Sequence, residues 1–364
     1  MIEIRCTNCH RPYPDKETPF RCLNCGGVFD FDGQLEIDPR KIDENLPGIW
    51  RYRHYFGLHA DSPIVYLGEG DTPLVWGKFA GREVACKLEY LNPTGSFKDR
   101  GTAILISFLK ERGVRSAIED SSGNAGASFA AYAARAGIKA RVFVPDYTSA
   151  PKRKQAEAYG AEVIRVQGAR TAASEAVLSA AEQGDVYASH AYLPHGILGF
   201  ATIAFEIVSQ LGGTPGTVIA PTGQGSLLLG LGRGFNALFH AGVIDNIPKL
   251  IGVQALACAP LWAVHQYGAA GMELVTEGET LAEGVRIRYP VRKDAILKMM
   301  ALNDGIFIAV EESEILLSQA ELARQGLYVE PTSAIVWNAL DQVMDDVRDP
   351  IVLVLTGTGL KSFG

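Results

Sequence analysis

The sequence predicts an α/β fold with mostly parallel sheets and helices on both faces, preceded by a small cysteine-rich element. Strand-like and helical patterns alternate along most of the chain. With 364 residues, of which 47% are hydrophobic and 21% charged, the chain is long enough to fill the cores of two domains. Two Cys-x-x-Cys pairs near the N-terminus set the first segment apart from this body.

The N-terminal element carries four of the six cysteines. Cys6 and Cys9 form one pair, Cys22 and Cys25 form the other, and twelve residues separate the pairs. This spacing is typical of tetrahedral zinc sites, and four thiolates leave no coordination position for water. The sequence therefore predicts a structural zinc or iron ion. Residues 1–40 hold five basic and seven acidic side chains, which argues against a nucleic-acid-binding ribbon.

The elements of the body follow from short apolar runs for strands and from helical periodicity for helices. In chain order we expect a strand at 84–88, a helix after Lys98 with its body at 102–109, a strand at 116–119, a helix at 127–136, a strand at 140–144, a helix at 151–159, a strand at 162–166 and a helix at 171–182. A second series begins near Thr217, with a strand at 218–220 and a helix at 227–235, and ends in a buried strand at 351–355.

Residues 92–101 (NPTGSFKDRG) place a lysine in the first turn of a predicted helix. Ser96, followed three residues later by Asp99, is typical of an N-cap with an acidic N3 position, which would put Lys98 at N2. The positive end of the helix dipole disfavours the ammonium form, and the neutral amine is the nucleophile that forms Schiff bases. An ordinary surface lysine can share this local pattern, so the assignment depends on the other motifs.

Two glycine-rich turns each connect a predicted strand to a predicted helix. Residues 121–126 (SSGNAG) follow the strand at 116–119, and residues 221–226 (PTGQGS) follow the strand at 218–220. The backbone N–H groups of such turns can point toward an anion beyond the carboxyl ends of the strands. The last strand ends at a third glycine-rich segment, 356–359 (TGTG).

The order of these motifs resembles the pyridoxal-phosphate enzymes of the tryptophan-synthase β fold type, and among them the threonine synthases. The matching segments are 68–74 (GEGDTPL), 92–101, 121–126, 330–334 (EPTSA) and 355–361 (LTGTGLK). The resemblance extends from about Leu67 to the C-terminus.

This resemblance implies two doubly wound three-layer domains of the fold type II architecture, with the cofactor between them. We expect a large cofactor-binding domain at 38–90 and 206–364, and a small mobile domain at 91–205. Many threonine synthases resemble this chain in having an N-terminal zinc ribbon, which here would comprise residues 1–37.

The resemblance also assigns roles within the small domain. Lys98 would hold pyridoxal phosphate as a Schiff base and then carry protons as a general base. Asn124 would donate a hydrogen bond to the ring hydroxyl oxygen. Ser121 and Ser122 would bind the substrate carboxylate.

The large domain would supply the remaining ligands. By resemblance, the cofactor phosphate would bind to a loop made of Gly223, Gln224, Gly225 and Ser226. The Thr356 hydroxyl would meet the pyridine nitrogen, where it cannot hold a proton as a carboxylate would. The ring is then a weaker electron sink, which favours elimination and addition at the β and γ carbons. Arg286 is the best match for a ligand of a substrate phosphate, and Glu330 could steer the substrate or the lysine.

The predicted function is that of a threonine synthase, which converts O-phosphohomoserine and water to threonine and phosphate by γ-elimination and β-addition. The alternative is a pyridoxal-phosphate lyase or β-replacement enzyme acting on serine, threonine or phosphoserine. It stays open because the loop 223–226 lacks the asparagines that are usual in threonine synthases, and Arg288 to Pro290 replace their Gly-Asn-Pro. A noncatalytic cofactor-binding sensor is a third possibility, which the combination of Lys98, Asn124 and Thr356 disfavours.

Composition limits the partners. A net charge of −7 does not favour nucleic acid, no apolar run reaches the eighteen residues of a membrane span, and the N-terminus lacks the apolar stretch of a signal peptide. We therefore expect a cytoplasmic protein, in the form of a homodimer, that acts on a small amino-acid substrate.

Overall fold

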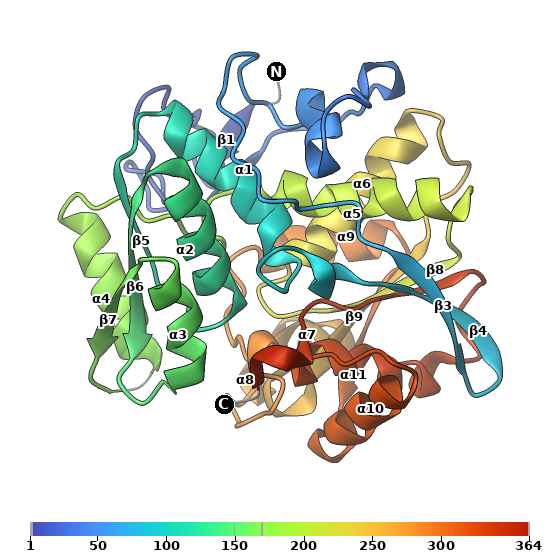
Figure 1. Ribbon diagram of the computed structural model, residues 1–364. Coiled ribbons are helices and arrows are strands. Elements are labelled where there is room, and N and C mark those ends of the chain that lie inside the picture. Colours follow the sequence, from blue (N-terminus) through green and yellow to red (C-terminus); the bar gives the residue numbers. More distant parts are fainter. Residues whose placement is uncertain (1–2, 149, 169, 363–364) are drawn as a thin grey trace. The chain divides into compact units, whose positions relative to one another are not determined.

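The computed structural model describes residues 3–148, 150–168 and 170–362 (Figure 1). The chain divides into two compact units. Unit 1 comprises Met1–Gly70, Asn92–Gly199 and Lys361–Gly364, and unit 2 comprises Asp71–Leu91 and Phe200–Leu360. Within the described ranges, no helix combines the length and the apolar character that crossing a membrane requires.

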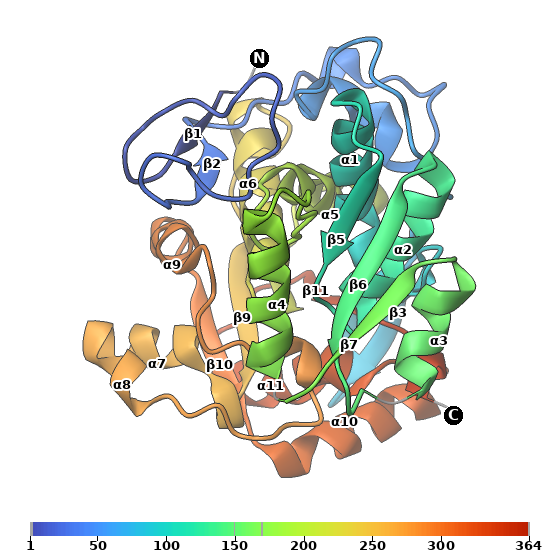
Figure 2. The same ribbon diagram turned by 90° about the vertical axis from the view of Figure 1, so that its left-hand side faces the viewer.

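Unit 1 contains two separate sheets. The cysteine-rich element forms an antiparallel pair, β1 (Ile4–Cys6) and β2 (Phe29–Phe31). The second sheet is parallel, in the order β5 (Ser116–Glu119), β6 (Lys139–Pro145) and β7 (Glu162–Val166). The helices of this unit are α1 (Lys98–Glu111), α2 (Asn124–Ala136), α3 (Ala150–Ala158) and α4 (Arg170–Glu182). Figure 2 shows α4 on one face of the parallel sheet and α2 and α3 on the other.

The alanine-rich sequence of α2 explains its place in unit 1. Alanine is the best helix former, and its small side chain lets the helix lie close to its neighbours. Ala127, Ala130 and Ala133 are all buried, as are Val142 and Val144 of β6. The helix ends at a glycine in the left-handed conformation, which releases the chain toward β6.

Unit 2 is built on a six-stranded sheet in the order β10-β9-β8-β11-β4-β3. Its strands are β3 (Leu74–Phe79), β4 (Arg82–Lys87), β8 (Thr217–Pro221), β9 (Lys249–Ala255), β10 (Ile306–Val310) and β11 (Ile351–Val354). Only β3 is antiparallel to its neighbour among these described strands, and every residue of β8 and β11 is buried. Continuous apolar strands of this kind are typical of sheets covered on both faces.

Helices cover both faces of this sheet, with α6 on one face and α10 and α11 on the other (Figure 1). The helices with bounds inside unit 2 are α6 (Ser226–His240), α7 (Pro260–Tyr267), α8 (Gly271–Leu274), α9 (Lys293–Leu302), α10 (Glu312–Arg324) and α11 (Pro331–Ala339). The division between the units falls within α5 (His195–Leu211).

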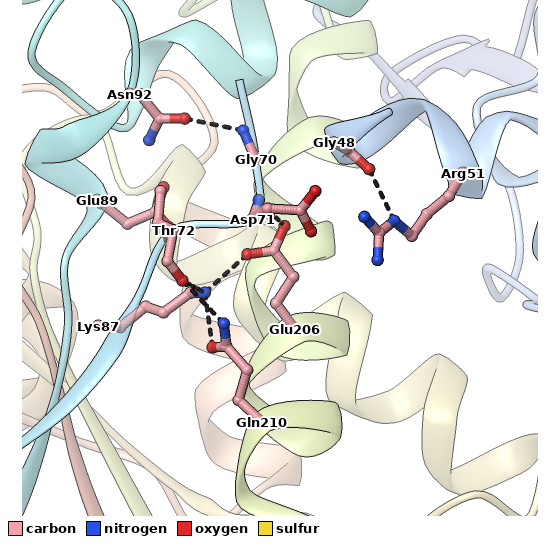
Figure 3. A network of polar contacts seen from close by, with 10 residues as sticks. All are labelled: Gly48, Arg51, Gly70, Asp71, Thr72, Lys87, Glu89, Asn92, Glu206 and Gln210. Atoms are coloured by element: carbon pink, nitrogen blue, oxygen red, sulfur yellow. Dashed lines mark hydrogen bonds and ion pairs between the residues drawn. The ribbon is translucent and has the colours of Figure 1, made fainter. Parts of the chain in front are cut away.

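A buried polar network fixes the start of β3 in unit 2 (Figure 3). The ammonium of Lys87 donates hydrogen bonds to the carbonyl oxygen of Thr72 at 2.6 Å, to Glu206 Oε2 at 2.7 Å and to Gln210 Oε1 at 2.9 Å. The other carboxylate oxygen of Glu206 accepts from the backbone N–H of Asp71 at 2.9 Å. Because Lys87 and Glu206 are buried, removing one of them would leave an uncompensated charge and cost about 3–5 kcal/mol.

The predicted α/β fold, with mixed sheets and helices, is confirmed, and the predicted strands at 116–119 and 162–166 coincide with β5 and β7. The prediction for the start of α1 was wrong. Lys98 is the first residue of that helix rather than the second, and no side chain caps it. Ser96 Oγ is buried without a hydrogen-bond partner among the described residues, and Asp99 binds elsewhere.

Candidate functional site

The turn that carries Lys98 is fixed by the carboxylate of Asp99. This carboxylate is fully buried and accepts hydrogen bonds from the backbone N–H and the hydroxyl of Thr94, both at 2.6 Å, and from the Ser128 hydroxyl at 2.6 Å. Burial raises the pKa of Asp99, and these hydrogen bonds act in the opposite direction. Lys98 itself is half-buried, with Nζ 4.9 Å from the centre of the Phe97 ring. Through Ser128, the lysine turn is attached to α2.

The same helix binds the 68–74 motif through Glu69. The Tyr132 hydroxyl, on α2, donates to Glu69 Oε2 at 2.6 Å, and Trp50 Nε1 donates to Oε1 at 2.8 Å. Burial raises the pKa of Glu69 above its usual value. Glu69 and Tyr132 were not among the predicted site residues. Their signal in the sequence is the spacing of polar residues along the alanine-rich helix, since Ser128 and Tyr132 are four residues apart.

The turn at 121–126 leads directly into α2. A Cβ atom at Gly126 would overlap the carbonyl oxygen of Ser121, so only glycine permits this approach. Ser121 Oγ accepts from the backbone N–H of Gly123 at 3.3 Å, and Ser121, Ser122 and Asn124 are all half-buried. The side chain of Asn124, the first residue of α2, accepts a hydrogen bond on Oδ1 from Lys361 Nζ at 2.8 Å.

The second glycine-rich turn, in unit 2, ends at the N-terminus of α6. Gly225 has a φ of +77° and precedes the helix, and no side chain caps the first turn. A Cβ atom at Gly223 would overlap the carbonyl oxygen of Gly284. The Gln224 side chain accepts from the backbone N–H of Val291 at 3.1 Å, and Ser226 is the first, buried residue of α6. A helix N-terminus without a side-chain cap offers its N–H groups to an anion.

The segment after β11 brings Thr356 and Glu330 together in unit 2. Thr356 is buried, its N–H donates to Ser333 Oγ at 2.8 Å, and its Oγ1 has no hydrogen-bond partner among the described residues. The backbone N–H of Glu330 donates to the carbonyl oxygen of Gly357 at 2.9 Å. Its carboxylate lies so close to Gly357 that a Cβ atom there would overlap it.

Arg286 follows the segment that contacts the 223–226 turn. Gly284, which abuts Gly223, donates its N–H to Thr332 Oγ1 at 3.0 Å. Arg286 Nη2 donates to the carbonyl oxygen of Glu277 at 3.1 Å, while its Nε is buried without a hydrogen-bond partner among the described residues.

The predicted residues thus form two sets, one in each unit. Lys98, Ser121, Ser122 and Asn124 belong to unit 1. Those in unit 2 are Gly223, Gln224, Gly225, Ser226, Arg286, Glu330 and Thr356.

The four N-terminal cysteines converge, with all four sulfur atoms within 4.8 Å of one another. Cys6 and Cys25 are separated by 3.4 Å between their sulfurs, and Cys9 and Cys22 by 3.6 Å. Four sulfurs at ~2.3 Å from one tetrahedral zinc would lie about 3.8 Å apart. The backbone N–H of Arg11 lowers the pKa of Cys9 to about 6, which favours the thiolate that binds metal.

Aromatic contacts attach this cysteine cluster to the rest of unit 1. Tyr13 packs edge-on against Phe108 of α1, with ring centres 6.0 Å apart, and Phe20 packs against Tyr187 at 5.3 Å. Arg112 Nη1, just after α1, donates to the carbonyl oxygen of Pro14 at 3.0 Å. The element that holds the cysteines therefore packs on the helix that begins at Lys98.

Comparison with known proteins gives the family. The description "Pyridoxal-phosphate dependent enzyme" matches residues 65–357, which include all the predicted site residues except the cysteines. The chain belongs to the pyridoxal-phosphate-dependent enzymes. Its relatives include the threonine synthase of Methanocaldococcus jannaschii, 34% identical over 98% of this chain and 92% of the relative. The threonine synthase of Synechocystis is 37% identical over 85% of this chain and 82% of the relative.

Solved structures of this fold include other amino-acid enzymes. A bacterial threonine deaminase, from the organism abbreviated T.th., is 28% identical, with a TM-score of 0.68 over 79% of this chain and 92% of that one. Maize serine racemase shares the fold at 20% identity, with a TM-score of 0.69 over 79% of this chain and 88% of that one.

The described side chains fit the cofactor that defines the family. Buried Thr356 Oγ1 has no protein partner among the described residues, as a ligand of a neutral pyridine nitrogen requires. The uncapped N-terminus of α6 suits a phosphate, and Lys98 supplies a primary amine.

Proposed function

We propose that this protein is a threonine synthase, which converts O-phosphohomoserine and water to threonine and phosphate by γ-elimination and β-addition. The observation that carries the proposal is the 34% identity to a curated threonine synthase over 98% of this chain. Similarity over almost the whole length includes both the cysteine-rich element and the loops around the predicted site.

Lys98, Asn124, Ser121 and Ser122 would act from unit 1. Bound pyridoxal phosphate withdraws electrons from the α carbon of the substrate and so allows bonds at its β and γ carbons to change. Lys98 would bind the aldehyde group of the cofactor and then move protons as a general base. Asn124 would donate to the ring hydroxyl oxygen. The two serines would bind the substrate carboxylate at the turn that precedes α2.

The phosphate of the cofactor would bind in unit 2 at Gly223, Gln224, Gly225 and Ser226, where the uncapped N-terminus of α6 provides N–H donors. The hydroxyl of Thr356 would meet the pyridine nitrogen. Its burial without a protein partner among the described residues supports this role. A hydroxyl cannot protonate that nitrogen fully, which favours elimination over reactions that need a stronger electron sink.

Arg286 would bind the substrate phosphate, and Glu330 would steer the substrate. The buried Nε of Arg286 has no hydrogen-bond partner within the described ranges, which supports an anionic ligand. The Glu330 carboxylate lies against Gly357, one residue beyond Thr356, which supports a role near the proposed pyridine ligand.

We further propose that Cys6, Cys9, Cys22 and Cys25 form a zinc ribbon with one structural zinc ion. The sulfur separations of 3.4 Å and 3.6 Å are close to those of a tetrahedral site. We also expect a homodimer in the cytoplasm. The division into a ribbon at 1–37, a large domain at 38–90 and 206–364, and a small mobile domain at 91–205 stays a prediction.

A lyase acting on serine or threonine is the second candidate. The 28% identity to a threonine deaminase favours it, as do Arg288 to Pro290, which depart from the usual threonine synthase sequence. Phosphate release and ammonia release should be compared for O-phosphohomoserine, serine, threonine and phosphoserine. A threonine synthase releases phosphate from O-phosphohomoserine and forms threonine. Ammonia from serine or threonine, with no reaction of O-phosphohomoserine, would replace the proposal with the lyase.

Lys98→Ala tests the cofactor assignment within the same series. The wild-type protein should show a visible absorption band from lysine-bound cofactor, and borohydride should fix the cofactor to the chain. Both properties should be lost in Lys98→Ala. A variant that still carries a borohydride-reducible linkage would show that another lysine binds the cofactor.

A further inference from the structure

Two polar residues on α2 meet segments that lie far from it in the sequence. Asn124 and Ser128 are four residues apart and so lie on one face of the helix. Ser128 binds Asp99, the neighbour of Lys98, and Asn124 binds Lys361 near the C-terminus. All of these contacts are within unit 1.

The contact with Lys361 decides which way the Asn124 amide faces. A lysine ammonium has three donors and no acceptor, so the amide atom 2.8 Å from Lys361 Nζ must be the oxygen. The amide nitrogen, which can only donate, is then turned away from Lys361. The two ends of an asparagine amide are nearly the same size, so without such a partner the amide can turn over.

Lys361 also acts on the charge of this region. Burial raises the pKa of Asp99, and the positive charge of Lys361 acts in the opposite direction. The half-buried ammonium is therefore close enough to influence the carboxylate that holds the Lys98 turn, while it directly contacts Asn124.

We propose that Lys361 is a positioning residue that turns the amide nitrogen of Asn124 toward the ring hydroxyl oxygen of pyridoxal phosphate. The inference rests on the proposed binding of the cofactor by Lys98 and Asn124. With Lys361 in place, the ring oxygen meets an N–H donor and a nearby positive charge, both of which stabilise its anionic form. Without Lys361, the amide can present its oxygen instead, and two lone pairs then face each other.

The test is cofactor binding to the Lys361→Met variant, which keeps the length of the side chain and removes its charge. Apo-protein is titrated with pyridoxal phosphate and followed by absorption. We expect the affinity to fall on the order of tenfold, as for loss of a charge-assisted hydrogen bond. The visible band should also fall relative to the near-ultraviolet band, because the ring oxygen then holds the proton more readily.

Two further variants separate this effect from a general loss of structure. Lys361→Arg keeps a cation that can only donate, so it should restore most of the affinity and the visible band. Lys110→Met removes an exposed lysine in the last turn of α1 and should match the wild-type protein in both measurements. Failure of Lys361→Arg to restore either property would count against the proposal.

A double-mutant cycle tests whether Lys361 acts through Asn124. In an Asn124→Ala background, Lys361→Met should cause no further loss of affinity and no further spectral change. Equal losses in both backgrounds would overturn the proposal, because Lys361 would then act on the cofactor directly or on the fold. An unchanged affinity and spectrum in the Lys361→Met variant would overturn it as well.

Failure of the inference and failure of the proposed cofactor site give different results. If the wild-type protein develops no visible band with pyridoxal phosphate, the proposed cofactor binding is wrong. If the band forms and disappears in Lys98→Ala but Lys361→Met behaves as wild type, only the role of Lys361 is wrong.

Discussion

Replacing Asp99 by alanine should destabilise the part of unit 1 that carries Lys98. Its carboxylate accepts three hydrogen bonds, each 2.6 Å long, from Thr94 and Ser128, which are buried themselves. Hydrogen bonds to a charged group contribute about 1.5–3 kcal/mol each, whereas removing the buried carboxylate relieves its desolvation. Taking the lower figure for each bond and allowing for that relief, we expect the free energy of unfolding to fall by about 3 kcal/mol.

The loss should be local, so the assay must resolve the two units. Urea unfolding gives the overall change, and hydrogen exchange on peptides from α1 and α2 shows where protection is lost. Asp61→Ala removes an exposed aspartate of the same unit and should change stability by less than about 0.5 kcal/mol. A loss below about 1 kcal/mol for Asp99→Ala, with unchanged exchange in α1 and α2, would refute the reasoning.

The pH dependence of the isosteric Asp99→Asn variant tests the same carboxylate. Burial raises the pKa of Asp99 above its usual 3.8, so the folded protein binds this proton more tightly than the unfolded chain. The contribution of the group to stability is therefore complete below pH 3.8 and is lost as the pH rises through the folded-state pKa. We expect the wild-type protein to lose stability relative to Asp99→Asn across this window. A constant difference would contradict the raised pKa.

Three further substitutions test the remaining assignments. Cys22→Ser should lower the metal content measured by elemental analysis, because a tetrahedral site needs all four sulfurs, whereas Cys258→Ala should leave it unchanged. Thr356→Asp should retain the cofactor but shift product ratios toward racemisation or transamination, and unchanged ratios would exclude Thr356 as the pyridine partner. Arg286→Ala should raise the KM for O-phosphohomoserine on the order of tenfold without affecting any reaction of serine, and Arg324→Ala, an exposed control on α10, should do neither.

Local features of the sequence predicted most of the fold. The strands at 116–119 and 162–166 were found because short apolar runs between turn residues carry their own signal. The glycine-rich turn at 121–126 was equally visible, since the close approach of Gly126 to the Ser121 carbonyl excludes any side chain. The antiparallel pairing of β3 with β4 was not predicted, because strand pairing is a tertiary property that the local pattern of either strand does not specify.

The start of α1 shows where local reasoning failed. Ser96 and Asp99 have the spacing of an N-cap and its N3 partner, but the structure uses neither in this way. Asp99 accepts from Ser128, 29 residues farther along the chain, and that competing partner is absent from any local pattern. The contact between Asn124 and Lys361 spans 237 residues and is invisible to local reasoning for the same reason.

The polar residues of α2 have a common physical explanation. An alanine-rich helix can be buried on most sides because its side chains are small, and its few polar groups must then find partners inside the protein. Ser128 and Tyr132 do so with the buried carboxylates of Asp99 and Glu69. Each contact joins a separate segment of unit 1 to the helix that begins at Asn124. Changes to these residues should therefore alter the placement of the Lys98 turn and of the 68–74 motif more than the helicity of α2 itself.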